Sequence, residues 1–301
     1  MNILEFDDTK LLWIGPPKLD GTPGRTYHLS GVNSGTEGVL LSDHPDGFEF
    51  GPTSLLRSKG AKQDGATFLR SVRDEREIRF NVHVFGRTAR EAMAVRTGWF
   101  RSWETDRPGH LCFYSQNLGW HFIRLQRGDA PRPTLGVDLA DERQFGFVET
   151  YEMHGVAMDP DYSSFEEEII WTNNLGLNEA TLRARNPGQR KLWPRYTMNG
   201  PGRWWIEDPL NAEDDLRLLS TPPLAANEEL RINTHPRRRT ARVYSPATGI
   251  DGRNVWAQLG GRRWLQPVLP GTSKDIVVRI EGGTLASKLI MQGVPKFEEP
   301  Y

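Results

Sequence analysis

The 301-residue sequence contains a single cysteine, so no disulfide can form within the chain. Cys112 lies in the apolar run HLCFY, which favours a buried thiol over a reactive one. No uninterrupted apolar stretch approaches the ~18 residues that suggest a membrane span. The first residues, MNILEFDDTK, carry acids where a secretory leader needs bases. We therefore expect synthesis in the cytoplasm and no membrane insertion.

An excess of charge of either sign is also missing. The 38 Lys and Arg residues nearly cancel the 39 Asp and Glu residues, which leaves a net charge of -1. This balance argues against a protein whose main task is to hold nucleic acid or an anionic membrane. The length exceeds the ~100–200 residues of a typical single domain, so two domains are expected, each with its own core.

The residue patterns of common catalytic centres are absent. No two of His83, His110, His121 and His154 have the spacing of a metal site. The acid clusters at 166–168 and 213–215 are typical of solvated loops, although a glycosidase needs only two converging acids. There is no Walker loop, Rossmann fingerprint or G-x-S-x-G elbow. We expect no catalytic residue, no metal and no cofactor, and hence no enzyme.

What the sequence has in abundance is turns. Its 30 glycines and 21 prolines are spread along the chain, which favours β-sandwiches and barrels. One helix is expected at 88–103, where Thr88 and Glu91 form a capping box. Its apolar side repeats at helical spacing and comprises Ala89, Ala92, Met93, Trp99, Phe100 and Trp103.

Strands are expected on both sides of this helix. Residues 77–86 alternate apolar and polar side chains, and the runs 107–115 and 119–129 are joined by a turn at 117–119. A further strand is expected within 144–160. The helix should therefore cover one face of an antiparallel sheet.

The apolar periodicity is interrupted at 158–168, MDPDYSSFEEE. We place the domain boundary there, with domains at 1–160 and 161–301. The second domain shows only short alternating runs separated by turns every 8 to 15 residues, as in an all-β sandwich.

Two features of the second domain suggest an interaction surface. The run RINTHPRRRTAR, at 231–242, holds five arginines that include Arg237, Arg238 and Arg239, and no acid. It fits either an ordinary exposed rim or a contact with phosphate. Trp204 and Trp205 are neighbours on an expected strand and point to opposite faces, so at most one enters the core and the other is free to meet a partner.

The order of these features resembles the distal tail proteins of long-tailed bacteriophages, known as minor tail proteins in phages of actinobacteria. The resemblance spans nearly the whole chain. It rests on IRFNVHVFG with the TAREAM helix, DRPGHLCFYS, AMDPDY and the hairpin motif NPGQRKLWPRYTMNGPG. The motif's signature positions are Asn186, Pro187, Gly188, Trp193, Pro194, Gly200, Pro201 and Gly202.

The resemblance implies a mainly β fold. The N-terminal domain would be a β-sandwich or split barrel with one flanking α-helix, and the C-terminal domain an all-β, galectin-like sandwich. Copies of the N-terminal domain would form a six-membered ring at the tail tip of the virion. The ring would join the tail tube protein to the tail-tip hub and other minor tail proteins, with a channel for phage DNA. The loop at 15–31 is expected to be an arm that reaches a neighbouring subunit.

One alternative of another class stays open. The tryptophans of the second domain could instead grip host cell-wall glycans, as in a carbohydrate-binding module. Exposed aromatic side chains gathered on one surface would favour that alternative, whereas an adaptor buries them in cores and subunit contacts.

Overall fold

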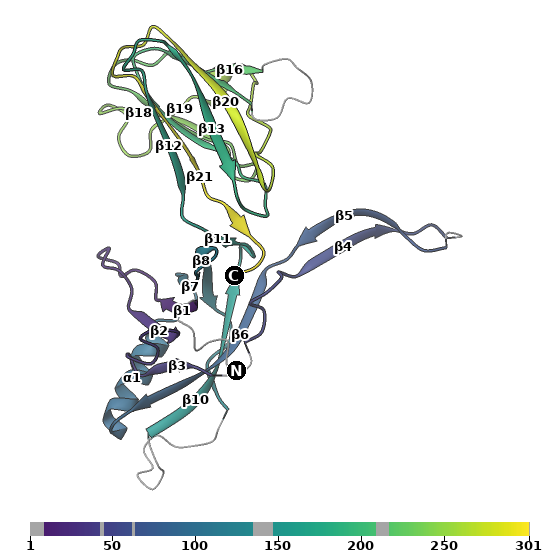
Figure 1. Cartoon of the computed structure of the whole chain (residues 1–301), viewed down its shortest axis with the longest axis vertical. Coiled ribbons are helices and arrows are strands. Elements are labelled where there is room, and N and C mark those ends of the chain that lie inside the picture. The colour runs from purple at the N-terminus through teal and green to yellow at the C-terminus, as the bar shows by residue number, and fades with distance from the viewer. Residues whose placement is uncertain (1–8, 43–44, 62–63, 135–146, 209–216, 301) are drawn as a thin grey trace. The chain divides into compact units, whose positions relative to one another are not determined.

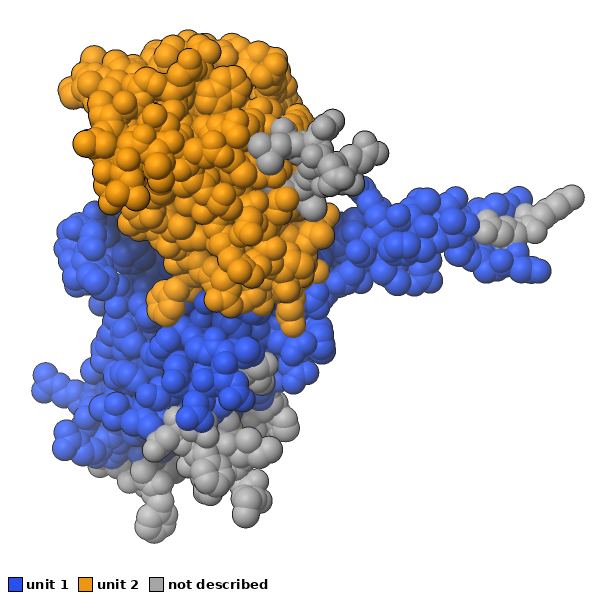
Figure 2. All heavy atoms as spheres, turned by 45° about the horizontal axis from the view of Figure 1, so that its top comes forward, with its two compact units in different colours: residues 1–164, 297–301 blue, residues 165–296 orange. Residues whose placement is uncertain are grey.

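The computed structural model describes residues 9–42, 45–61, 64–134, 147–208 and 217–300. By contacts the chain divides into two compact units. Unit 1 comprises residues 1–164 and 297–301, and unit 2 comprises residues 165–296 (Figures 1 and 2). This division differs from a simple boundary at residue 160, because the last five residues return to unit 1.

Unit 1 is built on one curled antiparallel sheet with the order β2-β1-β7-β8-β10-β6-β3. Its ends lie close enough for Gly35 next to β3 to donate a hydrogen bond to His28 of β2, so the sheet nearly closes into a barrel. The strands are β1 (Thr9–Ile14), β2 (Thr26–Ser30), β3 (Val39–Leu41), β6 (Arg76–Gly86), β7 (Gly109–Ser115), β8 (Gly119–Arg127) and β10 (Phe147–Ala157). Short strands β9 (Arg132–Pro133), β11 (Tyr162–Ser163) and β22 (Lys296–Phe297) join this sheet at its side.

The expected helix is present as α1 (Ala89–Arg101). Thr88 caps it by accepting from the Glu91 amide at 3.2 Å, as predicted. The Glu91 carboxylate, however, accepts from the amide of Arg87 rather than closing the box on Thr88. Met93, expected on the apolar side, is exposed, since the buried face is centred on Ala92 and Trp99. Among the described residues, no helix is long and apolar enough to cross a membrane.

Three tryptophans form the centre of the unit 1 core. Trp13 of β1 stacks on Trp103 with ring centroids 3.8 Å apart, and Trp99 of α1 meets both rings edge-on. The Trp13 indole donates to the Ser102 hydroxyl, so its polar atom is satisfied inside the core. The helix is thereby held against the sheet by aromatic packing.

Unit 2 is a sandwich of two antiparallel sheets. The larger sheet has the order β12 (Glu167–Thr172), β21 (Lys288–Gly293), β14 (Arg195–Asn199), β17 (Glu229–Asn233), β18 (Thr240–Tyr244) and β19 (Arg253–Asn254). The smaller sheet has the order β13 (Glu179–Asn186), β20 (Thr272–Glu281), β15 (Arg203–Glu207) and β16 (Leu218–Ser220). The one helical element among the described residues of unit 2 is the 3-10 turn η2 (Trp256–Leu259). The mainly β fold class predicted from the sequence is confirmed.

Candidate assembly surface

A two-stranded hairpin of unit 1, formed by β4 (Thr53–Ser58) and β5 (Thr67–Arg73), is exposed along nearly its whole length. In Figure 1 it reaches out beyond the body of unit 1, and in Figure 2 it stands clear as a blue arm. Every residue of β4 is exposed. An isolated two-stranded hairpin is marginally stable in water, which makes this exposed hairpin a candidate surface for contact with another chain.

The side chains of the hairpin are unusually apolar for such a position. Leu55 and Leu56 follow one another on β4, so they point to opposite faces, and they are 50% and 40% exposed. On β5, Phe68 and Leu69 are 61% and 60% exposed. Because both faces carry large apolar groups, neither face is a conventional polar outer surface.

The base of the hairpin is firmly fixed to unit 1. Arg73, at the end of β5, forms ion pairs with Asp161 and with Glu298 in the returning C-terminal segment, the latter at 3.2 Å. Next to it the fully buried Arg76 donates to the carbonyl oxygens of Phe48 and Glu298 at 3.0 and 2.8 Å, and lies over the Tyr162 ring. The arm is therefore anchored by charge-assisted hydrogen bonds rather than by its own packing.

The loop expected to be an arm is shorter than predicted. Thr26–Ser30 pair with β1 as strand β2, so only residues 15–25 connect the two strands. Within that connection Lys18 and Thr22 close a turn, and Leu19 at its end is fully exposed. A role in reaching a neighbouring copy stays a prediction for this shorter segment.

The signature positions at 186–202 are turn and packing positions. The buried Asn186 amide donates to the carbonyl oxygens of Arg190 and Val268, while its side-chain oxygen accepts from Gly188. A β-carbon on Gly200 would lie 1.9 Å from the carbonyl oxygen of Ala225, so only glycine fits there.

The other signature positions also lie in turns or pack against neighbouring residues of the sandwich. Pro194 is buried and its carbonyl accepts from Thr234. Trp193 is half-buried against His235, and Pro187 is exposed. Pro201 follows a cis peptide bond, and a β-carbon on Gly202 would lie 2.8 Å from the Glu281 carbonyl oxygen. These residues shape the end of the sandwich.

The side chains of Trp204 and Trp205 point to opposite faces of the smaller sheet, as the strand periodicity predicts. Trp204 is fully buried, with its indole donating to the Asn199 carbonyl, so it cannot belong to an interaction surface. Trp205 is half-buried on the outer face of the smaller sheet, opposite Arg279 and Ser220. Only Trp205 remains available to a partner.

The five arginines at 231–242 do not form one patch. Arg231 pairs with Glu229 and lies over the Tyr244 ring, and Arg242 donates to backbone carbonyls at 251 and 252. Arg237 and Arg238 are exposed in the turn between β17 and β18, and Arg239 lines a surface hollow. An interaction role of Arg237, Arg238 and Arg239 stays a prediction.

Of the histidines and acids considered as catalytic candidates, His121, Glu166 and Glu168 each have a partner within the fold. His121 is buried with Nδ1 2.9 Å from the Pro300 carbonyl oxygen, and burial lowers its pKa. Glu166 pairs with Arg195, and Glu168 accepts from Gln292. The acids at 213–215 lie outside the described residues. Within the described part of the chain, no three His, Cys, Asp or Glu side chains gather as a metal site would require.

The fold is shared with solved phage proteins. The SPP1 Dit protein, a hub of the adsorption apparatus of phages that infect Gram-positive bacteria, matches with a TM-score of 0.62 at 11% identity, over 96% of this chain and 99% of its own. A chain of the phage P2 baseplate in its activated conformation with calcium matches with a TM-score of 0.54 at 8% identity, over 97% and 99%. A chain of the same baseplate in its activated conformation with strontium matches with a TM-score of 0.51 at 8% identity, over 94% and 97%. No protein-family model and no curated protein sequence matches the chain. At the level of fold, the resemblance inferred from the sequence is confirmed.

Proposed function

We propose that the chain is a structural protein of the tail tip of a long-tailed phage. Copies of unit 1 form a closed ring, expected to be a hexamer, that joins the tail tube protein to the hub and other minor tail proteins. Phage DNA passes through the ring, and the protein resides in the virion after synthesis in the host cytoplasm. This role needs neither catalysis nor a cofactor.

The observation that carries the proposal is the β4–β5 hairpin. A head-to-tail ring needs two complementary patches on each copy, and an anchored arm with apolar side chains on both faces supplies one of them. Fully burying a Leu or Phe side chain contributes about 1.5–3 kcal/mol, so covering half of each of four such groups contributes roughly 3–6 kcal/mol per contact. That gain offsets part of the ~4–15 kcal/mol that association costs in lost translational and rotational freedom.

The fold comparisons support the proposal independently. The similarity covers nearly the full length of both chains, so it includes the hairpin-bearing unit and the sandwich together. The SPP1 protein is described as a hub and the P2 chain belongs to a baseplate. We infer the same kind of architectural role here.

The proposal is tested by the mass of the purified chain across a concentration series, with light scattering behind a sizing column. A closed ring gives one species near six times the 34.2 kDa chain mass, and negative-stain images of that species show a central channel. A monomer at all concentrations that also fails to associate with purified tail tubes would contradict the proposal.

A further inference from the structure

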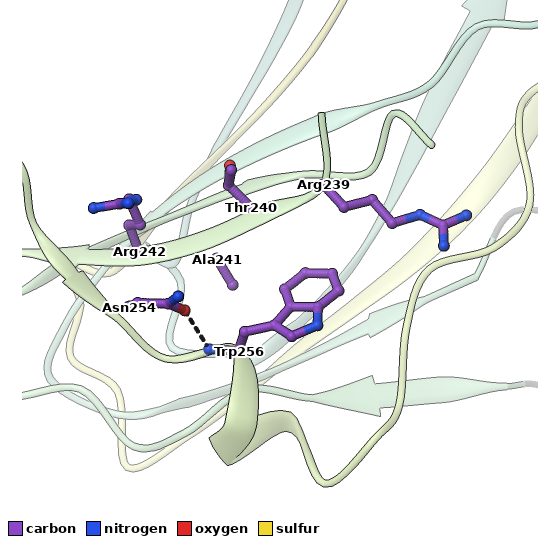
Figure 3. A pocket seen from close by; sticks show the side chains of 6 residues that line it. All are labelled: Arg239, Thr240, Ala241, Arg242, Asn254 and Trp256. Carbon is purple, nitrogen blue, oxygen red and sulfur yellow. Dashed lines mark hydrogen bonds between the residues drawn. The ribbon is translucent and has the colours of Figure 1, made fainter. Parts of the chain in front are cut away.

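A surface hollow of unit 2 has features of a ligand site. It lies where β18, β19 and η2 meet and encloses about 220 Å³. Figure 3 shows its lining: Arg239, Thr240, Ala241, Arg242, Asn254 and Trp256. Drug-sized ligands occupy ~300–1,000 Å³, so the hollow is suited to a smaller unit such as one monosaccharide.

The polar groups of this hollow include unused hydrogen-bond donors. The Nε of Arg239 is buried without a hydrogen-bond partner. The Thr240 hydroxyl and the Asn254 side-chain NH₂ are exposed to solvent and make no hydrogen bond to another described residue. Asn254 uses only its side-chain oxygen, which accepts from the Trp256 amide. Donors left unpaired around a concavity are the groups that a bound ligand can satisfy.

The charge around the hollow favours an anion. None of its lining residues is an acid. Asp208, a described acid that acts electrostatically on Arg239, is fully buried and already accepts from the amides of Leu265 and Gln266, with Arg217 at 3.8 Å. Burial raises the pKa of Asp208, and these amides and the two arginines oppose that rise. Among the lining residues themselves, Arg239 and Arg242 supply two guanidiniums and no side chain supplies a carboxylate.

The hollow also has an aromatic side chain in its lining, that of Trp256. Trp256 is half-buried, and in Figure 3 its indole lies beside the side chain of Arg239. The guanidinium of Arg263 lies 5.6 Å from the centre of the same ring, which places a further cation at the rim. An indole beside unpaired donors suits a ring with one apolar face and several oxygen atoms.

We propose that this hollow binds a saccharide unit bearing a phosphate or carboxylate group. The apolar face of the sugar packs on Trp256, its hydroxyl oxygens accept from Thr240 and Asn254, and its anionic group meets Arg239. Arginine is suited to that contact because its planar fork matches phosphate and carboxylate oxygens. This proposal does not depend on whether the chain forms a ring.

A single-stranded nucleic acid is the less favoured occupant. Proteins that bind such strands present successive aromatic side chains along a basic groove. Here one tryptophan lines an isolated hollow, and the neighbouring arginines diverge to other partners. The observations therefore favour one sugar unit over a strand.

The test uses the full chain and four probes: glucose 1-phosphate, glucose, inorganic phosphate and a thymidine decanucleotide. Saturation-transfer NMR reports the bound protons of the sugar probes and the oligonucleotide, and calorimetry gives the affinities of all four. Arg239→Gln removes the central cation. Arg238→Gln, which removes the same charge from an exposed neighbour outside the hollow, is the matched control. Trp256→Ala tests stacking, and Arg239→Gln still decides the question if that variant fails to fold.

The expected result is that glucose 1-phosphate binds more tightly than glucose or phosphate alone. Arg239→Gln should weaken this binding at least tenfold, and Arg238→Gln should change it less than twofold. Equal binding of glucose and glucose 1-phosphate would overturn the proposal, as would equal losses in the two arginine variants. Binding of the oligonucleotide alone would assign the hollow to nucleic acid. If none of the probes bound at concentrations of about 10 mM, the hollow would not be a ligand site.

Discussion

The buried guanidinium of Arg76 donates a hydrogen bond of 2.8 Å to the carbonyl oxygen of Glu298, 222 positions further along the chain. This contact ties the last residues of the sequence to the strand that follows the hairpin. Phe297 stacks on His121 in the same segment, with ring centres 4.1 Å apart. The C-terminal segment is therefore a structural part of unit 1 and braces the base of its arm.

Replacing Arg76 by Met should destabilise unit 1. The change leaves the carbonyls of Phe48 and Glu298 without their donor in a buried site, which costs about 2–5 kcal/mol of unfolding free energy. Urea unfolding followed by circular dichroism measures this loss. Arg90→Met, on the exposed side of α1, is the control and should stay within about 0.5 kcal/mol of the wild type. Equal stability of the two variants would show that the buried arginine is not a brace.

The adjacent tryptophans give a matched pair of substitutions. Trp204→Ala empties a site in the unit 2 core next to Trp171 and should cost about 3–5 kcal/mol. Trp205→Ala removes a half-buried ring from the outer face and should cost less than about 1.5 kcal/mol. Thermal unfolding of the two variants compares them directly. A larger loss of stability for Trp205→Ala than for Trp204→Ala would mean that Trp205, not Trp204, faces the core.

The thiol of Cys112 provides a pH-dependent test of burial. Burial raises its pKa from the ordinary value of 9.0 to about 12. The folded state then keeps its proton while the unfolded state loses it, so this group's contribution to stability is complete below pH 9 and falls as the pH rises from 9 towards 12. A thiol reagent at pH 8 should react only after denaturant is added. Rapid labelling of the native chain would contradict the buried placement.

Much of the fold was predictable because several segments carry strong local signals. The alternation at 77–86, the glycine turn between β7 and β8, and the Thr88 cap each specify an element without help from distant residues. Strand periodicity also required Trp204 and Trp205 to separate, although it could not say which ring enters the core.

The β4–β5 hairpin, the returning C-terminal segment and the hollow at Arg239 could not be predicted, because no local residue pattern marks them. In the hairpin, Leu55 and Leu56 are adjacent, as are Phe68 and Leu69, so the apolar residues do not alternate and no half-buried strand is indicated. The return of residues 297–301 rests on contacts with Arg76 and His121, which no local pattern can show. The hollow at Arg239 likewise joins residues from three separate elements.

The central claim is that the hairpin drives self-association, and the most direct test is the mass of hairpin variants in solution. Leu55→Ser and Leu56→Ser each change one face of β4, and Ile250→Ser, which changes an exposed apolar residue of unit 2, is the control. All three side chains are exposed in the single chain, so the melting temperature of the isolated chain should hardly change. We predict that light scattering finds the wild type and Ile250→Ser near six times 34.2 kDa, whereas each hairpin variant shifts towards the single-chain mass at the same concentration. Rings of unchanged mass and stability in both hairpin variants would contradict the account.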